Sequence, residues 1–303
     1  MSPQKNYLPL LNAEIFSALK NHFTVTFTYE TILKNVYTKF LNKDFSIIDV
    51  GAHSGLHLKE FIKLVGESRR IIAIEPQPWL SSLLAKEYNH LGNIRVINAA
   101  IGQTPGKSKF VFVENAPEES GLKERIYNIS DPHKKIIDVD VITLDSLTDD
   151  VSSPVYIKVD IEGGEIDLLL SGKKFIEKHR PLFSVEYGSP SYTAYGHQAE
   201  TLYHWAEDSN YYIADMFGGV FYDIETWKTC CDKAYWDWFL IPKERIEWWI
   251  EINQTLQNNA LISILNASLQ LGLTTVAKNS SSFKASLVRF LKRLRTVARR
   301  LNG

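Results

Sequence analysis

The chain has 303 residues, of which 45% are hydrophobic, 23% charged and 12% aromatic. This composition argues against a disordered or fibrous protein and is typical of a globular one, long enough for a large α/β domain with additions. No apolar stretch approaches the roughly 20 residues that cross a bilayer, and the N-terminus lacks the pattern of a signal peptide. We therefore expect a cytoplasmic protein.

Charge is distributed unevenly along the chain. The net charge is −1, yet the residues after Glu251 include eight lysines and arginines and no acid. Residues 283–301 place apolar side chains on one helical face and basic ones on the other, a pattern that favours peripheral contact with an anionic membrane at its inner face. Docking onto the same chain or formation of a homo-oligomer stays open as the alternative. No nucleic-acid module accompanies the tail, so no nucleic-acid partner is expected.

The only two cysteines are adjacent, at Cys230 and Cys231. Neighbouring cysteines rarely bridge each other, and two cysteines do not make a structural zinc site. We expect reduced, inert thiols.

The predicted elements begin with helices. Apolar residues three or four apart predict helical structure over residues 7–43. From residue 45 onward, short apolar runs alternate with stretches of helical spacing. The predicted strands lie in "FSIIDV", "RIIAIEP", "IRVINAAIG", "DVDVITLDSL", "PVYIKVD", "PLFSVEYG", "YYIADMFGGVFY" and "YWDWFLIPK", with "SKFVFVEN" as an inserted strand or hairpin arm.

This alternation predicts an α/β fold with a doubly wound, mostly parallel sheet. Ligands of such sheets bind beyond the carboxyl ends of the strands, where the strand order reverses. We expect an N-terminal helical extension over residues 1–44, a central α/β domain over 45–250 and a basic helical appendage over 251–303.

The first predicted strand runs into a glycine loop. Gly51 and Gly55 flank Ala52, His53 and Ser54, directly before a predicted helix. A missing Cβ lets a ligand approach the backbone, and N–H groups at a helix start bind carboxylates or phosphates. A purely conformational need for glycine is the alternative explanation of the same pattern.

Two acids accompany this loop. Asp49 stands two residues before Gly51, and Glu75 ends the second predicted strand 24 residues after Gly51. That separation is close to the one at which an acid accepts hydrogen bonds from ribose hydroxyls. A negative charge at Asp49 suits a cationic amine and sulfonium better than a pyrophosphate. The pattern favours S-adenosyl-L-methionine, with an NAD(P)-dependent oxidoreductase as the alternative.

Several motifs in this order resemble the FkbM-type methyltransferase family. They are "IIDVGAHSG", "AIEPQP", "VINAAIGQTPG", "VITLDSL", "VYIKVDIEGGEIDLLLSG" and "PLFSVEY", within roughly residues 45–243. The resemblance implies a Rossmann-like, S-adenosylmethionine-dependent O-methyltransferase that acts on hydroxyls of sugars or small secondary metabolites. A non-catalytic nucleotide-sensing module, bound to membrane through the tail, is the alternative outside enzymes.

The resemblance also implies roles for particular positions. The loop Gly51–Gly55 would hold the methionine portion and Glu75 the ribose, while Asn98 and Ala99 would lie beside the adenine. The family usually has Asn where this chain has His53, so the role of that position rests on its backbone.

The run "KVDIEGGE" brings three acids to the end of one predicted strand. Burying several carboxylates is unfavourable unless they bind something, because like charges raise one another's pKa. Asp160 is placed to point toward the cofactor's methyl group, and Glu186 stands at the same end of the next strand. These two are the candidate catalytic residues, as bases for an acceptor hydroxyl. Acid clusters also hold Mg²⁺ in some proteins, but nothing in the sequence fixes a metal.

Overall fold

The computed structural model describes residues 7–23 and 28–253. The basic tail, residues 283–301, for which the sequence predicts membrane contact, lies outside the described residues. Among the helices that are described, none has the length and apolar character needed to cross a membrane.

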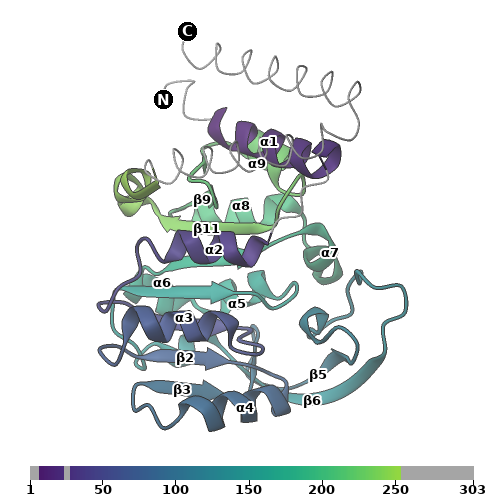
Figure 1. Ribbon diagram of the computed structural model, residues 1–303, viewed down its shortest axis with the longest axis vertical. Helices are drawn as coiled ribbons and strands as arrows, with labels where there is room; N and C mark the ends of the chain where they lie inside the picture. The colour runs from purple at the N-terminus through teal and green to yellow at the C-terminus, as the bar shows by residue number, and fades with distance from the viewer. Residues whose placement is uncertain (1–6, 24–27, 254–303) are drawn as a thin grey trace, which may run out of the picture.

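A sheet of eight strands forms the centre of the described structure, in the order β10-β9-β11-β8-β7-β1-β2-β3 (Figure 1). Its strands are β1 (Ser46–Val50), β2 (Ile71–Ile74), β3 (Ile94–Ile97), β7 (Val155–Val159), β8 (Leu182–Glu186), β9 (Tyr211–Asp215), β10 (Val220–Phe221) and β11 (Asp237–Pro242). The five strands from β8 to β3 are parallel, and β11 runs antiparallel between β8 and β9. The prediction of a doubly wound, mostly parallel sheet is confirmed.

Helices cover both faces of this sheet. Figure 1 shows α2, α3 and α4 in front of the strands and α5 and α6 behind them. The α-helices are α1 (Tyr7–Phe23), α2 (Tyr29–Tyr37), α3 (Leu56–Val65), α4 (Pro78–Tyr88), α5 (Glu165–Ser171), α6 (Lys173–His179), α7 (Ser189–Tyr192), α8 (Ala199–Asp208) and α9 (Ile224–Cys230). Short 3₁₀ turns are η2 (Pro117–Glu119), η3 (Leu144–Leu147), η4 (Thr193–Tyr195) and η5 (Lys243–Arg245).

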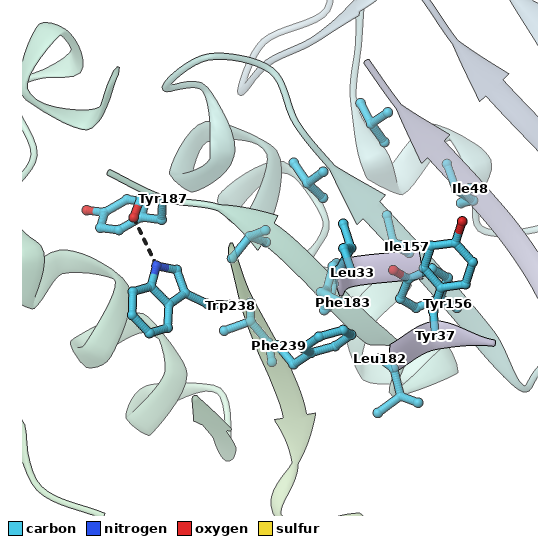
Figure 2. Packing of buried hydrophobic residues seen from close by; sticks show 14 of the residues in the cluster. Leu33, Tyr37, Ile48, Tyr156, Ile157, Leu182, Phe183, Tyr187, Trp238 and Phe239 are labelled. Carbon is cyan, nitrogen blue, oxygen red and sulfur yellow. Dashed lines mark hydrogen bonds between the residues drawn. The ribbon is translucent and has the colours of Figure 1, made fainter. Parts of the chain in front are cut away.

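The central strands are buried because helices lie on both sides of them. Every residue of β1 and of β7 is buried, which explains their nearly unbroken apolar sequences. Figure 2 shows buried side chains of the main hydrophobic cluster, including Leu33 and Tyr37 of α2, and the Trp238 indole, which donates to the backbone oxygen of Tyr187 at 3.0 Å. This bond satisfies the polar atom of a fully buried ring.

The two N-terminal helices pack on the same core. Leu33, Val36 and Tyr37 of α2 are buried in the main hydrophobic cluster. In α1, the Asn12 amide donates to Asp215 at the end of β9, with 2.9 Å between Nδ2 and Oδ2. Residues 7–23 and 29–37 thus contribute directly to the folded α/β unit.

A second, three-stranded sheet follows β3, in the order β4-β6-β5. It consists of β4 (Ala100–Ile101), β5 (Gly106–Val113) and β6 (Lys134–Ile142), and β5 pairs antiparallel with β6. The predicted inserted strand therefore exists, as one arm of a hairpin. The segment between its two arms contains η2 and lies near the carboxyl ends of the central strands.

The two cysteines are free and buried. Burial, assisted by the charge of Asp215, raises the pKa of Cys230 to about 12. A thiol that stays protonated at neutral pH is a poor nucleophile, which agrees with the expectation of inert cysteines.

Candidate active site

The glycine loop turns sharply at the carboxyl end of β1. Gly51 has φ +79°, and a Cβ there would lie 1.8 Å from the backbone oxygen of Asp160. Gly55 precedes α3 with φ +80°, and its Cβ would meet the Leu84 side chain at 2.7 Å. Both glycines are thus required by close packing within the protein, and the loop backbone reaches the end of β7 only because position 51 has no side chain.

Glu75 links this loop to the end of β2. Its carboxylate accepts from the backbone N–H of His53 and from that of Gln77, each at 2.8 Å. The residue is only 2% exposed, and burial raises its pKa to about 7, although these two N–H bonds oppose the rise. Two bonds leave further lone pairs on the carboxylate for a ligand's hydroxyl groups.

A cavity lies beside these residues, and the roughly 650 Å³ of space free of protein atoms there includes solvent at its open side. It occupies the carboxyl ends of β1, β2 and β7, where the order of the sheet reverses, as expected for a doubly wound fold. Its wall includes five predicted site residues, namely Gly51, His53, Glu75, Ala99 and Asp160. The hairpin insertion closes the opposite side through Phe110, Pro117 and Leu122.

Other predicted residues stand outside that wall. Asn98 donates its amide to the backbone oxygens of Glu75 and Pro76, at 2.9 and 3.0 Å, and so holds the loop after β2 in place. Ala52, Ser54, Gly55, Asp49 and Glu186 are also absent from the cavity lining. Their predicted contacts with a cofactor or substrate stay predictions.

Asp49 is buried within β1, away from the cavity lining. It is 1% exposed, and neither carboxylate oxygen has a hydrogen-bond partner among the described residues. Burial raises its pKa, while the charge of Lys158 on the neighbouring strand opposes that rise. For Lys158 itself, burial lowers the pKa, but the carboxylates of Asp160 and Asp49 outweigh burial and keep the ammonium charged.

Asp160 and Glu186 form a coupled pair beside the cavity. Lys158 donates to Asp160, with 2.9 Å between Nζ and Oδ2. Although burial opposes it, this ammonium lowers the pKa of Asp160 to about 2. Burial and the charge of Asp160 raise the pKa of Glu186 well above its usual range. As pH rises, the pair therefore ionises first at Asp160, and Glu186 keeps its proton to higher pH.

Glu162 completes an acidic group with this pair. One carboxylate oxygen from each of Asp160, Glu162 and Glu186 lies within 4.8 Å of the other two. Glu162 forms an ion pair with the buried guanidinium of Arg125 and accepts from the Ser191 hydroxyl at 3.1 Å. Oxygen ligands of this kind suit Mg²⁺. However, a lysine, an arginine and a bound proton already compensate the three groups.

Four contributors went unrecognised in the sequence. The site also receives Gln77 and the buried Arg125 from loops and Tyr195 from η4. Glu30 of α2 contacts His57 of α3 near the charged cluster. Gln77 follows Glu75 by two residues, and this short spacing could have indicated in the sequence that it lies at the same site. The other three come from segments distant in the sequence, and no local pattern indicates their position.

The cavity suits a sulfonium nucleoside. A buried carboxylate with free lone pairs, Glu75, lies at one wall, where it can accept from the hydroxyl groups of a ribose. The side-chain oxygen of Gln77 is a buried acceptor without a partner in the described part of the chain. These residues therefore fit S-adenosylmethionine.

Solved structures similar to this chain include several methyltransferases. One is the methyltransferase FkbM from Methylobacillus flagellatus KT, with 17% identity, a TM-score of 0.41, and coverage of 67% of this chain but only 47% of that one. Another is Aeropyrum pernix fibrillarin with natively bound S-adenosyl-L-methionine, with 15% identity, a TM-score of 0.36, and coverage of 78% and 76%. A further one, a S-adenosylmethionine-dependent methyltransferase from Aquifex aeolicus, has 15% identity, a TM-score of 0.34, and coverage of 68% and 90%. This chain thus spans about half the length of the Methylobacillus protein.

No protein of curated function matches the chain. The family model of the methyltransferase FkbM domain matches residues 49–212, which is more than half of the chain. That range contains the glycine loop, Glu75 and the Asp160–Glu186 pair, and the match supports S-adenosylmethionine as the cofactor, as the sequence predicts. The chain therefore belongs to the FkbM methyltransferase family.

Proposed function

We propose that this protein is a S-adenosylmethionine-dependent O-methyltransferase that acts on a hydroxyl of a sugar or of a small secondary metabolite. The observation that carries the proposal is the coupled carboxyl pair beside the cavity. Asp160 is ionised and held by Lys158, while Glu186 retains a proton. An ionised carboxylate at this cavity could accept the proton that an acceptor hydroxyl loses during O-methylation.

The cavity wall supports a specific place for the cofactor. Glu75 would accept from ribose hydroxyls, and the backbone around Gly51 and His53 would hold the amino-acid portion. When bound, S-adenosylmethionine supplies an electrophilic methyl group on a sulfonium. Alignment of the acceptor against that group is worth an effective molarity of roughly 10⁵ M or more.

Asp160 would then accept the proton of the acceptor hydroxyl. Its carboxylate accepts a hydrogen bond from the acceptor hydroxyl and takes the proton as the oxygen becomes bonded to carbon. A pKa of about 2 makes Asp160 a weak base for a free alcohol, but the acceptor O–H group becomes far more acidic as its oxygen bonds to the methyl carbon. Such assistance contributes on the order of 10² to 10⁴ in rate. Glu186 holds Asp160 in place by donating to it.

Calorimetry separates this proposal from its alternatives. The full chain is expected to bind S-adenosylhomocysteine tightly and NADH not at all, and the reverse outcome would identify an oxidoreductase. Transfer of labelled methyl from S-adenosylmethionine to a panel of glycans and small alcohols then identifies the acceptor. Tight cofactor binding without transfer to any extract from the source cells would favour a nucleotide-sensing module.

The basic tail gives a separate proposal, peripheral binding to membrane. In the sequence of residues 283–301, apolar residues at helical spacing are interspersed with arginines and lysines, and there are no acids. Deletion of residues 279–303 is expected to abolish sedimentation with phosphatidylglycerol vesicles, whereas vesicles of phosphatidylcholine alone should bind neither protein. Unchanged sedimentation of the shortened chain would overturn membrane binding and leave docking or self-association.

A further inference from the structure

Gln77 lines the cavity beside Glu75 and has a buried side-chain oxygen without a hydrogen-bond partner in the described residues. The residue is 3% exposed and lines the cavity two positions after Glu75. Its backbone N–H donates to the Glu75 carboxylate at 2.8 Å, and its side-chain Nε2 donates to the backbone oxygen of Pro117 at 3.2 Å. The side-chain Oε1 is buried and has no partner within residues 7–23 and 28–253.

The hydrogen bond to Pro117 fixes the orientation of the Gln77 side-chain amide. The backbone oxygen of Pro117 can only accept, so the amide must turn its NH₂ group toward Pro117. The reversed amide would oppose two oxygens and lose that bond. Because the two ends of the amide group are rigidly joined, Oε1 must face away from Pro117. A buried acceptor without a partner is costly, so this position suits a ligand that brings a donor.

The surroundings indicate which ligand group brings the donor. The cavity lining includes five apolar residues, Ala99, Ile101, Phe110, Pro117 and Leu122, beside the acid Glu118. Ser120, a small polar residue of the same lining, accepts from the backbone N–H of Val113 at 3.0 Å. Apolar walls favour a flat heterocycle over a ribose, and the free lone pairs for ribose hydroxyls lie on Glu75.

We propose that Gln77 recognises the purine of the cofactor, and that its Oε1 accepts a hydrogen bond from the 6-amino group of adenine. This inference rests on the proposed cofactor. Gln77 then acts as a specificity residue, because a 6-oxo purine would set one oxygen against another. A site built to hydrogen-bond a ligand group rejects an analogue that lacks the group far more strongly than an apolar pocket does.

The test is calorimetric binding of three ligands to the full chain. These are S-adenosylhomocysteine, the analogue with hydrogen at purine position 6, and S-inosylhomocysteine with oxygen there. The wild type is expected to bind them in that order of affinity, with at least about tenfold between the first and the last. Gln77→Met should bring the first and last to within about threefold of each other. The matched control is Gln103→Met, which removes an exposed glutamine bonded to Asp167 outside the cavity and should leave the preference intact.

The ratio of affinities isolates the purine contact. Gln77→Met also loses the bond to Pro117, but that loss weakens all three ligands equally. An unchanged preference in Gln77→Met, or a wild type without preference, would overturn the inference. The wild-type series decides the question even if Gln77→Met does not fold. A wild type that binds none of the three would instead overturn the proposed cofactor itself.

Discussion

The cofactor cavity and the acidic group beside it are built in opposite ways. In the cavity, the loops after β1, β2 and β3 lie close in sequence, and Glu75 is satisfied by backbone N–H groups. In the acidic group, the carboxylates of Asp160, Glu162 and Glu186 are compensated by side chains and by a proton. These compensating groups come from three separate elements, including the hairpin insertion.

Under the proposed function, this difference separates the binding of the cofactor in the cavity from the methyl transfer at the acidic group. A site made from backbone holds its ligand through the shape of the chain, and one substitution with a larger residue can destroy it. A site made from coupled charges depends on which carboxyl group keeps the proton. Replacing a carboxyl group by an amide of the same shape, as in Asp to Asn or Glu to Gln, reveals which group is protonated. Substitutions at Gly51, at the carboxyl pair and at Glu75 test the difference, in order of decreasing expected effect.

The largest effect is expected at the glycine loop. Gly51→Ala places a Cβ within 1.8 Å of the Asp160 backbone oxygen at φ +79°, and should lower the free energy of unfolding by more than about 3 kcal/mol. The matched control is Gly196→Ala, since Gly196 has the same φ but no described atom within 4 Å of the position that its Cβ would take, and about 1 kcal/mol is expected. Urea denaturation measures both. Equal losses would mean that dihedral strain, and not contact with β7, requires Gly51.

The two carboxyls of the pair should respond unequally. Asp160→Asn removes the ionised group and should lower kcat by about 10² to 10⁴, with S-adenosylhomocysteine affinity changed less than about threefold. Glu186→Gln should cost less than about tenfold in kcat, because Glu186 is already protonated and Gln still donates to Asp160. Methyl-transfer kinetics measure both variants. The opposite ranking would identify Glu186 as the base.

The smallest effect is a pH dependence at Glu75. Burial raises its pKa from 4.5 to about 7, so the folded state binds this proton more tightly than the unfolded state does. Stability is therefore expected to fall as pH rises from 5 to 8, and Glu75→Gln should reduce the fall by about 1 to 3 kcal/mol. Urea denaturation at pH 5 and pH 8 measures the two slopes. Parallel slopes would show that Glu75 does not titrate in this range.

Much of the fold could be predicted because its patterns are local. The buried strands show unbroken apolar runs, and the loop from Gly51 to Gly55 follows one of them directly. The position of Glu75 at the end of β2 followed from the same alternation. Asp49 shows the limit of this reasoning, since sequence cannot tell whether an acid near a loop faces a cavity or the protein interior. Arg125 shows another, because its pairing with Glu162 depends on how a hairpin insertion folds back over the sheet.

The Arg125–Glu162 pair ties the hairpin insertion to the loop that carries Asp160. Both side chains are nearly inaccessible to water, and Ile126 also donates its backbone N–H to the backbone oxygen of Pro190 at 3.4 Å. Loss of either charge would leave the other buried without an ionic partner in a region of low polarity. The insertion and the loop after β7 must therefore change together during divergence. A hairpin grafted from a relative would work here only if it brought its own arginine.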